Sequence, residues 1–171
     1  MEAKERRAKI LRLLRSSGAP ITGSELAQRM GVSRQIVVQD VALLRTGGSV
    51  IFATPEGYVM PNVAGNVVRR VIATKHTTNA QMRDELETVV DLGGTMVDVS
   101  IEHPVYGEMT APLRLSSRAG VEVFMRHFES GETSPISQLT GGVHLHTVEA
   151  PDEQTMERIL TALREKGYLV E

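Results

Sequence analysis

The chain has 171 residues, of which 41% are hydrophobic and 23% charged, a balance that is ordinary for a globular protein and excludes bulk disorder. It contains no cysteine, which excludes a disulfide framework, thiol catalysis and a cysteine-based zinc finger. The longest apolar runs are only a few residues long, and no apolar stretch follows the charged N-terminus. We therefore expect no membrane span and no signal peptide, and predict a cytoplasmic protein of one large or two small domains.

Charge is distributed unevenly along the chain. Residues 1–60 hold nine Lys or Arg and five Asp or Glu, whereas residues 61–171 hold ten basic and sixteen acidic residues and all five histidines. A basic segment followed by an acidic one indicates two domains with different partners, of which the first binds a polyanion. The segment 61–66 contains Pro, Asn and Gly, which predicts a boundary between a domain of residues 1–62 and a domain of residues 67–171.

The first domain is predicted to form three short helices followed by a hairpin. Residues 3–16 carry an apolar stripe surrounded by basic residues, and Thr22 with Glu25 predicts a capping box that opens a second helix. Ser33 is a favourable N-cap for a third helix that ends near Thr46. Two segments with alternating polarity follow, and they predict a hairpin of strands Ser49–Ala53 and Gly57–Met60.

This order of elements is that of a winged helix-turn-helix domain, whose third helix fits the major groove of B-DNA. Val37, Val41 and Leu44 form the expected buried stripe of that helix, so the residues near its start face outward to base edges. Basic residues elsewhere are expected to contact phosphates. The predicted DNA-contacting residues are Ser33, Arg34, Gln35, Val38, Gln39 and Arg45. A small helical domain whose exposed Arg and Gln side chains are merely solvated is the alternative.

The stretch GVSRQIVVQDVALLRTGG at 31–48, together with PEGYVM at 55–60, resembles the winged-helix domain of the biotin-repressor-like family. The resemblance favours the DNA-binding interpretation. Asp40 matches an acidic position of that family, and we interpret it as an intramolecular partner for an arginine rather than as a base reader.

The second segment alternates strand and helix patterns. They predict strands over 67–74, 96–101, 108–115, 143–149 and 168–170, and helices over 79–92, 118–128 and 152–166. The order β-α-β-β-α-β with an appended α-β predicts an α+β fold, an α/β sandwich in which helices cover one face of a mostly antiparallel sheet.

The chemistry of this second segment is concentrated in its histidines. His144 and His146 alternate along one predicted strand, so their imidazoles emerge from the same face and form half of a transition-metal site. His76, at the end of the first strand, and Glu85, in the helix that follows, complete a three-histidine, one-carboxylate set if they reach the same face. A structural pair of hydrogen-bonded histidines is the alternative.

Other residues compete for these roles. Asp84 and Glu87 rival Glu85 as the carboxylate, or belong to a solvated helix face. His103 precedes Pro104 in a predicted turn and is a metal ligand, a pocket residue or a structural hydrogen-bonding group. His127, late in a helix, is best interpreted as a cation near the negative end of the helix dipole.

Several motifs of this segment occur together, namely VVDLGG at 89–94, VDVSIEHPVYGE at 97–108 and LTGGVHLHTVEAPDEQTMERI at 139–159. With His76 and the Glu-Leu pair at 85–86 they resemble the three-histidine (3H) domain. Joined to a winged helix, this domain makes the whole chain similar to the niacin-responsive transcriptional repressors of NAD biosynthesis and niacin uptake genes. The resemblance implies a divalent metal, nickel or zinc, held by His76, Glu85, His144 and His146.

A mechanism follows as a hypothesis from that resemblance. Nicotinic acid, the implied effector, offers a carboxylate and a ring nitrogen and would bind at or beside the metal, which supplies the counter-charge. His103 and Tyr106 are the further candidates for its pocket. Binding would bias the placement of two winged helices in a homodimer on a double-stranded DNA operator, so that nicotinic acid acts as co-repressor.

Two other functions stay open at this point. The protein is a regulator that senses the metal itself, or a metal-dependent hydrolase with a DNA-binding appendage. The sequence offers no second carboxylate with a clear role as general base, and a hydrolase leaves the winged helix unexplained. We therefore predict that the protein is not an enzyme.

Overall fold

The computed structural model describes residues 2–61 and 67–171, and the chain divides into two compact units, residues 1–64 and 65–171. Each unit has its own hydrophobic core, as expected of an independent domain. The predicted boundary segment falls mainly on residues 62–66, which lie outside the described residues.

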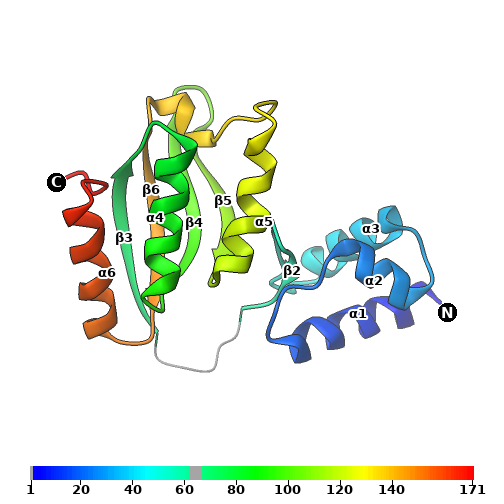
Figure 1. Ribbon diagram of the computed structural model, residues 1–171. Helices are drawn as coiled ribbons and strands as arrows, with labels where there is room; N and C mark the ends of the chain where they lie inside the picture. Colours follow the sequence, from blue (N-terminus) through cyan, green and yellow to red (C-terminus); the bar gives the residue numbers. More distant parts are fainter. Residues whose placement is uncertain (1, 62–66) are drawn as a thin grey trace. The chain divides into compact units, whose positions relative to one another are not determined.

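The N-terminal unit contains three helices and a two-stranded hairpin, in the predicted order (Figure 1). They are α1 (Ala3–Ser17), α2 (Gly23–Met30), α3 (Arg34–Thr46), β1 (Phe52–Thr54) and β2 (Gly57–Val59). Val37 and Val41 of α3 are buried, and Leu44 is half-buried against the same core. The predicted stripe therefore packs inward, and the helix-turn-helix architecture is confirmed.

The hairpin is shorter than predicted and pairs with the segment before α2. β1 begins three residues late because the backbone N–H of Ser49 donates to the carbonyl of Leu44 and closes α3. Tyr58 exchanges two backbone hydrogen bonds with Ile21, at 2.8 and 2.9 Å. Gly57 allows this pairing, because a Cβ at its position would lie 2.5 Å from the Ile21 carbonyl oxygen.

Two predicted N-caps form, but the capping box at the start of α2 is only half present. Thr22 Oγ1 accepts a hydrogen bond from Glu25 N at 3.1 Å, and Ser33 Oγ accepts one from Ile36 N at 3.4 Å. The Glu25 carboxylate pairs with Arg29, one turn along the helix, at 2.5 Å. This i,i+4 ion pair takes the place of the reciprocal bond to the cap.

The C-terminal unit alternates strands and helices as predicted. Its elements are β3 (Val68–Lys75), α4 (Asn79–Asp91), β4 (Thr95–His103), β5 (Gly107–Leu115), α5 (Arg118–Glu129), the 3-10 helix η1 (Ile136–Thr140), β6 (Val143–Ala150) and α6 (Glu153–Glu165). The sequence pattern assigns no element between the helix 118–128 and the strand 143–149, where the structure has η1. No helix in the described ranges is long and apolar enough to cross a membrane.

The four strands form one antiparallel sheet in the order β3-β6-β4-β5. β6 is inserted between β3 and β4, which α4 connects, so the arrangement is a split β-α-β unit. The predicted last strand, 168–170, is reduced to one bridge between Thr74 and Leu169, flanked by the backbone hydrogen bonds from Lys75 N to Tyr168 O and from Val170 N to Ala73 O. The α+β fold class is confirmed.

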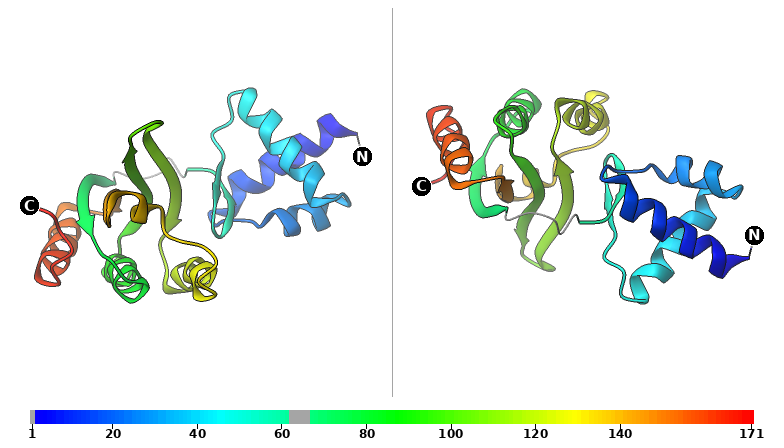
Figure 2. Two further views of the ribbon diagram at one scale, coloured as in Figure 1. Left: turned by 90° about the horizontal axis from the view of Figure 1, so that it is seen from above. Right: turned by 90° about the horizontal axis from the view of Figure 1, so that it is seen from below.

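Helices α4, α5 and α6 lie side by side on one face of this sheet (Figures 1 and 2). Strand β6 shows the resulting alternation clearly: its even-numbered residues, from His144 to Ala150, are buried toward the helices, whereas Val143 and Leu145 are exposed. The core between the sheet and the helices is built from Val, Leu, Ile and Met side chains. It places the even-numbered face of β6 opposite α4.

Candidate metal centre and nucleic-acid interface

The two histidines of β6 point into the buried layer between the sheet and α4, as their alternation predicts. Their Nε2 atoms are 3.0 Å apart. Nδ1 of His144 lies 2.7 Å from the Gly142 carbonyl oxygen, and Nδ1 of His146 lies 2.6 Å from the Asp98 carbonyl oxygen. Because a carbonyl only accepts hydrogen bonds, each Nδ1 carries the hydrogen, and each Nε2 presents a lone pair to the interior.

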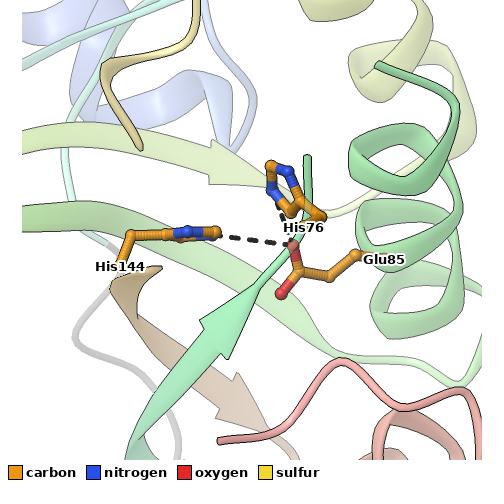
Figure 3. Close-up of side chains that lie close together, drawn as sticks. All are labelled: His76, Glu85 and His144. Atoms are coloured by element: carbon orange, nitrogen blue, oxygen red, sulfur yellow. Dashed lines mark ion pairs between the residues drawn. The ribbon is translucent and has the colours of Figure 1, made fainter. Parts of the chain in front are cut away.

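His76 and Glu85 complete the cluster from two other elements. His76 follows directly after β3, and Glu85, on α4, is fully buried. The Glu85 Oε2 atom lies 3.2 Å from His76 Nε2, 3.7 Å from His144 Nε2 and 3.8 Å from His146 Nε2. Figure 3 shows His76, Glu85 and His144 converging on one point. The structure thus brings all four predicted ligands together.

The chemistry of this cluster fits a divalent transition metal. Among the described residues, neither oxygen of Glu85 has a partner in hydrogen-bond geometry, although the side chain is completely buried. Burial raises the pKa of Glu85, but the contacts with His144, His146 and His76 outweigh it and hold that pKa well below its usual value. A buried carboxylate beside inward-facing imidazole lone pairs is a donor set that suits a divalent transition metal, and one ligand atom each from His76, Glu85 and His144 lies within 4.8 Å of the others.

The rival carboxylates of α4 point elsewhere. Asp84 bonds to Lys166 at 2.7 Å and to the Tyr168 hydroxyl at 2.8 Å, so it fastens the C-terminal segment to α4. Glu87 lies 3.7 Å from Arg83 and 3.4 Å from Arg118. Glu85 is therefore the one of these three carboxylates that faces the histidines.

In the N-terminal unit, α3 leaves a polar face uncovered near its start. Arg34, Gln35 and Gln39 are exposed, and Val38 is exposed at the margin of the same surface. Ser33 is exposed while its hydroxyl caps the helix. This is the surface that the sequence predicts to enter a major groove.

Two charged residues of α3 have intramolecular partners. Asp40 is buried, and Arg6 donates to it at 2.5 Å, which agrees with its interpretation as a partner for an arginine. Arg45 Nε donates to the Ile51 carbonyl oxygen at 2.7 Å, so this residue ties α3 to the start of the hairpin while its side chain remains exposed. The side chain that the sequence predicts to contact a phosphate is thus held in one orientation by this hydrogen bond.

Comparison with known proteins identifies the family of each unit. Residues 69–171 match the 3H domain, and residues 6–59 match a helix-turn-helix domain. The chain is 47% identical to the probable transcription repressor NiaR of Thermotoga maritima over 168 residues, which cover 98% of this chain and 95% of the relative. It is 42% identical to the transcription repressor NadR of Bacillus subtilis over 168 residues, 96% of this chain and 93% of the relative.

The chain belongs to the 3H-domain family of transcription repressors. It is a DNA-binding repressor related to NiaR and NadR, which confirms the resemblance on which the sequence interpretation rests.

Two cavities of this 3H repressor lie against the cluster of histidines around Glu85. An outer one of about 420 Å³ is formed at the start of α4 and around η1, which is within the size range of small-molecule sites. A smaller inner one of about 40 Å³ lies between the histidines and apolar side chains of α4 and α5. His76, Pro135 and Ser137 border both cavities, so these three residues lie between the outer cavity and the inner one.

The structure does not bring His103 and Tyr106 to this site. Both lie in the turn between β4 and β5, where His103 Nδ1 accepts backbone hydrogen bonds from Val105 at 3.1 Å and Tyr106 at 3.2 Å. Their rings are 5.1 Å apart, and Tyr106 is 76% exposed. Neither residue lines either cavity beside the cluster. Of the three roles open to His103, the structure shows the hydrogen-bonding one.

The sequence reasoning missed Thr74 and Asp98, both of which hold the ligands in place. Thr74 is completely buried, and its hydroxyl lies 3.0 Å from His144 Nε2. Asp98 lies at a β-bulge, and besides its carbonyl bond to His146 its carboxylate accepts the Thr147 backbone N–H at 2.8 Å. Thr74 was detectable from the sequence, because it lies two residues before His76 on the same face of a strand. The bulge was not.

Proposed function

We propose that this repressor controls genes of NAD biosynthesis and niacin uptake, with nicotinic acid as co-repressor bound in a metal-containing 3H domain. The observation that carries the proposal is the buried cluster of three histidines and one unsatisfied carboxylate, next to a cavity of small-molecule size. It lies in a protein whose other domain is a DNA-binding helix-turn-helix. The repressor is proposed to act on DNA in the cytoplasm and to have no enzymatic activity.

The proposed metal is nickel or zinc, with His76, Glu85, His144 and His146 as ligands. When bound, it supplies a positive charge that attracts a carboxylate. The protein residues do the rest: the Gly142 and Asp98 carbonyls fix the tautomers of the two β6 histidines, which keeps Nε2 available.

Nicotinic acid is proposed to bind at the cavities bordered by His76, Pro135 and Ser137. Among the described residues that line them there is no lysine or arginine, so a bound metal is the available counter-charge for the ligand carboxylate. The inner cavity of about 40 Å³ is too small for the ring of nicotinic acid, so the ring is proposed to occupy the outer cavity of about 420 Å³. The roles predicted for His103 and Tyr106 in the effector pocket stay predictions, since neither residue lines these cavities.

DNA recognition is proposed to use the start of α3. Arg34, Gln35 and Gln39 contact base edges, whereas Ser33, Val38 and Arg45 complete the surface toward the groove and the phosphates. One winged helix buries little DNA surface, so we propose that a homodimer binds two half-sites, with the 3H domain as the dimerisation domain.

A regulator that senses the metal alone is the second candidate. It is favoured by the buried cluster, whose four side chains form a ligand set without any organic molecule. The hydrolase alternative is not favoured, because the described residues lining both cavities include no carboxylate, and Glu85 is itself a proposed ligand.

The test is DNA affinity at fixed salt, measured on a duplex that the full-length protein has selected from a random library in the presence of nickel and nicotinic acid. We expect nicotinic acid to tighten binding of the nickel-loaded protein, and nicotinamide, which lacks the carboxylate, to have little effect. The His144→Ala/His146→Ala variant should retain weak non-specific binding and lose this response. Tightening by nickel alone, with no further change on adding nicotinic acid, would instead support the metal sensor.

A further inference from the structure

The face of the C-terminal sheet that points away from the helices carries an apolar stripe on two neighbouring strands. No helix or strand of the described residues 67–171 covers this face (Figure 2). Val71 on β3 is 68% exposed, and Val143 and Leu145 on β6 are 40% and 39% exposed. Ala73 pairs with Leu145 across the strands and joins them. An antiparallel sheet with one solvated face normally carries polar side chains there, so this stripe indicates a contact surface.

Charges of opposite sign lie toward opposite edges of the sheet, a lysine on the β3 side and two glutamates on the β4–β5 side. Lys75 lies on β3, level with Val143 of β6. Glu102 and Glu108 lie on β4 and β5, and the Ser100–Leu145 pairing places them at the same level along the strands. Both carboxylates are exposed on the open face, because Glu102 is two residues from Ser100, and Glu108 accepts a hydrogen bond from Thr110 on that face.

The two carboxylates also face each other directly. Glu102 and Glu108 are paired positions of the β4–β5 ladder, and like charges at paired positions destabilise a sheet. A cation placed between them from outside would remove this repulsion. Lys75 lies two strands from Glu102 and three strands from Glu108 on the same sheet, so it cannot serve its own chain in this way.

A second copy can be placed on the open face by a two-fold axis that runs parallel to the strands, above the gap between β6 and β4. This rotation lays the β3 edge of one copy on the β5 edge of the other, and each residue keeps its position along the strand direction. Lys75 of each copy then faces Glu102 and Glu108 of the other. Val71, at the level of Pro112, faces Pro112 of the other copy, and Leu145 lies next to the axis. One operation therefore matches both the charges and the apolar side chains, which is the property of an isologous interface.

We propose that a second copy of this chain packs its open sheet face onto this one about that axis, as two aligned sheets. The proposal rests on the homodimer of the proposed function and names its surface. It assigns Lys75, Glu102 and Glu108 as the charges that set the orientation of the two copies, and the apolar stripe as the buried centre.

The charge pattern gives a direct test with full-length protein and sedimentation velocity over a range of micromolar concentrations. In Lys75→Glu, three carboxylates meet at each end of the contact, and in Glu102→Lys/Glu108→Lys three ammonium groups meet. We expect each variant alone to dimerise at least about tenfold more weakly than wild type. An equal mixture of the two variants should form heterodimers, because every contact in the mixed pair joins opposite charges.

Arg158→Glu, an exposed reversal on α6, is the matched control and should leave the dimer unchanged. Recovery of dimers in the mixture also shows that both variants are folded. A monomeric wild type would overturn the homodimer and this surface together. A dimer that neither variant weakens, or variants whose mixture stays monomeric, would overturn the surface while leaving the proposed homodimer in place.

Discussion

A substitution at Gly142 would disturb the proposed metal site without changing any of its four proposed ligands. Its φ is +97°, and a Cβ at its position would lie 2.5 Å from the His76 carbonyl oxygen, whereas real Cβ atoms do not approach closer than 3.0 Å. The Gly142 carbonyl also accepts from His144 Nδ1. A Gly142→Ala substitution therefore pushes the His76 backbone away by at least about 0.5 Å and moves the bond that orients His144.

The expected effect follows from the tolerance of metal coordination. Metal–ligand distances in proteins hold to about 0.2 Å, so a displacement of this size removes His76 from good geometry. Weakening a ligand's support costs roughly 10–100-fold in metal affinity. Backbone strain at this φ adds about 1–3 kcal/mol of destabilisation of the folded domain. Competition with a chromophoric chelator measures the zinc or nickel affinity of each variant.

The neighbouring Gly141 is the matched control. It also has a positive φ, +66°, but no atom lies within 4 Å of a Cβ built there. Gly141→Ala should lower stability by about 1 kcal/mol through left-handed strain and leave metal affinity within a few-fold of wild type. If Gly142→Ala bound metal as tightly as Gly141→Ala, the placement of His76 and His144 by this backbone contact would be refuted.

Three further predictions concern the two domains. Arg34→Ala should weaken binding to the selected operator by about 1–3 kcal/mol, with a much smaller effect on a random duplex, and equal loss on both duplexes would remove Arg34 from base recognition. Burial lowers the pKa of His146, but the Glu85 carboxylate outweighs burial and raises that pKa, so a proton competes with the metal for this imidazole. As the pH is lowered from 8, zinc affinity should therefore already be falling before pH 6.5 is reached. Calorimetry from pH 8 to 5.5 checks this, and a loss of affinity confined to below pH 6 contradicts it. Gly57→Ala brings a Cβ to 2.5 Å from the Ile21 carbonyl oxygen, so it should loosen the hairpin and reduce DNA affinity. Gly48→Ala places a Cβ with no atom within 4 Å and should leave DNA affinity unchanged. Fluorescence anisotropy titrations compare the two variants, and equal affinities would show that the pairing of the hairpin with Ile21 is unimportant for DNA binding.

The sequence predicts most of the architecture because local signals repeat regularly. Ser33 caps α3 as a hydroxyl before a periodic apolar run should, and the stripe of α3 turns inward as the helical period requires. His144 and His146 share a face because side chains of a strand alternate, and no tertiary information is needed for that inference.

The choice among the three carboxylates of α4 could not be made in the same way. Asp84, Glu85 and Glu87 are close in sequence, and the hydrophobic pattern fixes the rotation of a helix only to within a residue. Packing on the sheet decides it, because Met82, Leu86 and Val89 point into the core and Glu85 turns with them toward the histidines. The family resemblance selected Glu85, the one of the three that lies beside the histidines, while the residue pattern alone left the question open.

The surroundings of the ligands were the least predictable part. η1 borders the cavities although its sequence has no helical period, and the bulge at Asp98 depends on how β4 and β6 fall out of register. His103 and Tyr106, the further candidates for the effector pocket, lie in the turn between β4 and β5. In the structure that turn is explained by its own hydrogen bonds, with His103 accepting two backbone N–H groups.

Strand β6 connects the proposed metal centre with the proposed interface. Val143, His144, Leu145 and His146 are consecutive, so the odd residues face the open side of the sheet and the even ones face α4. A strand is held by its ladders on both sides and moves as a unit, so a shift of the imidazoles on one face also shifts the apolar side chains on the other. In the proposed homodimer, a ligand that moves β6 thereby changes how the two copies meet. Binding in the 3H domain thus reaches the interface between the two copies without any contact between effector and DNA.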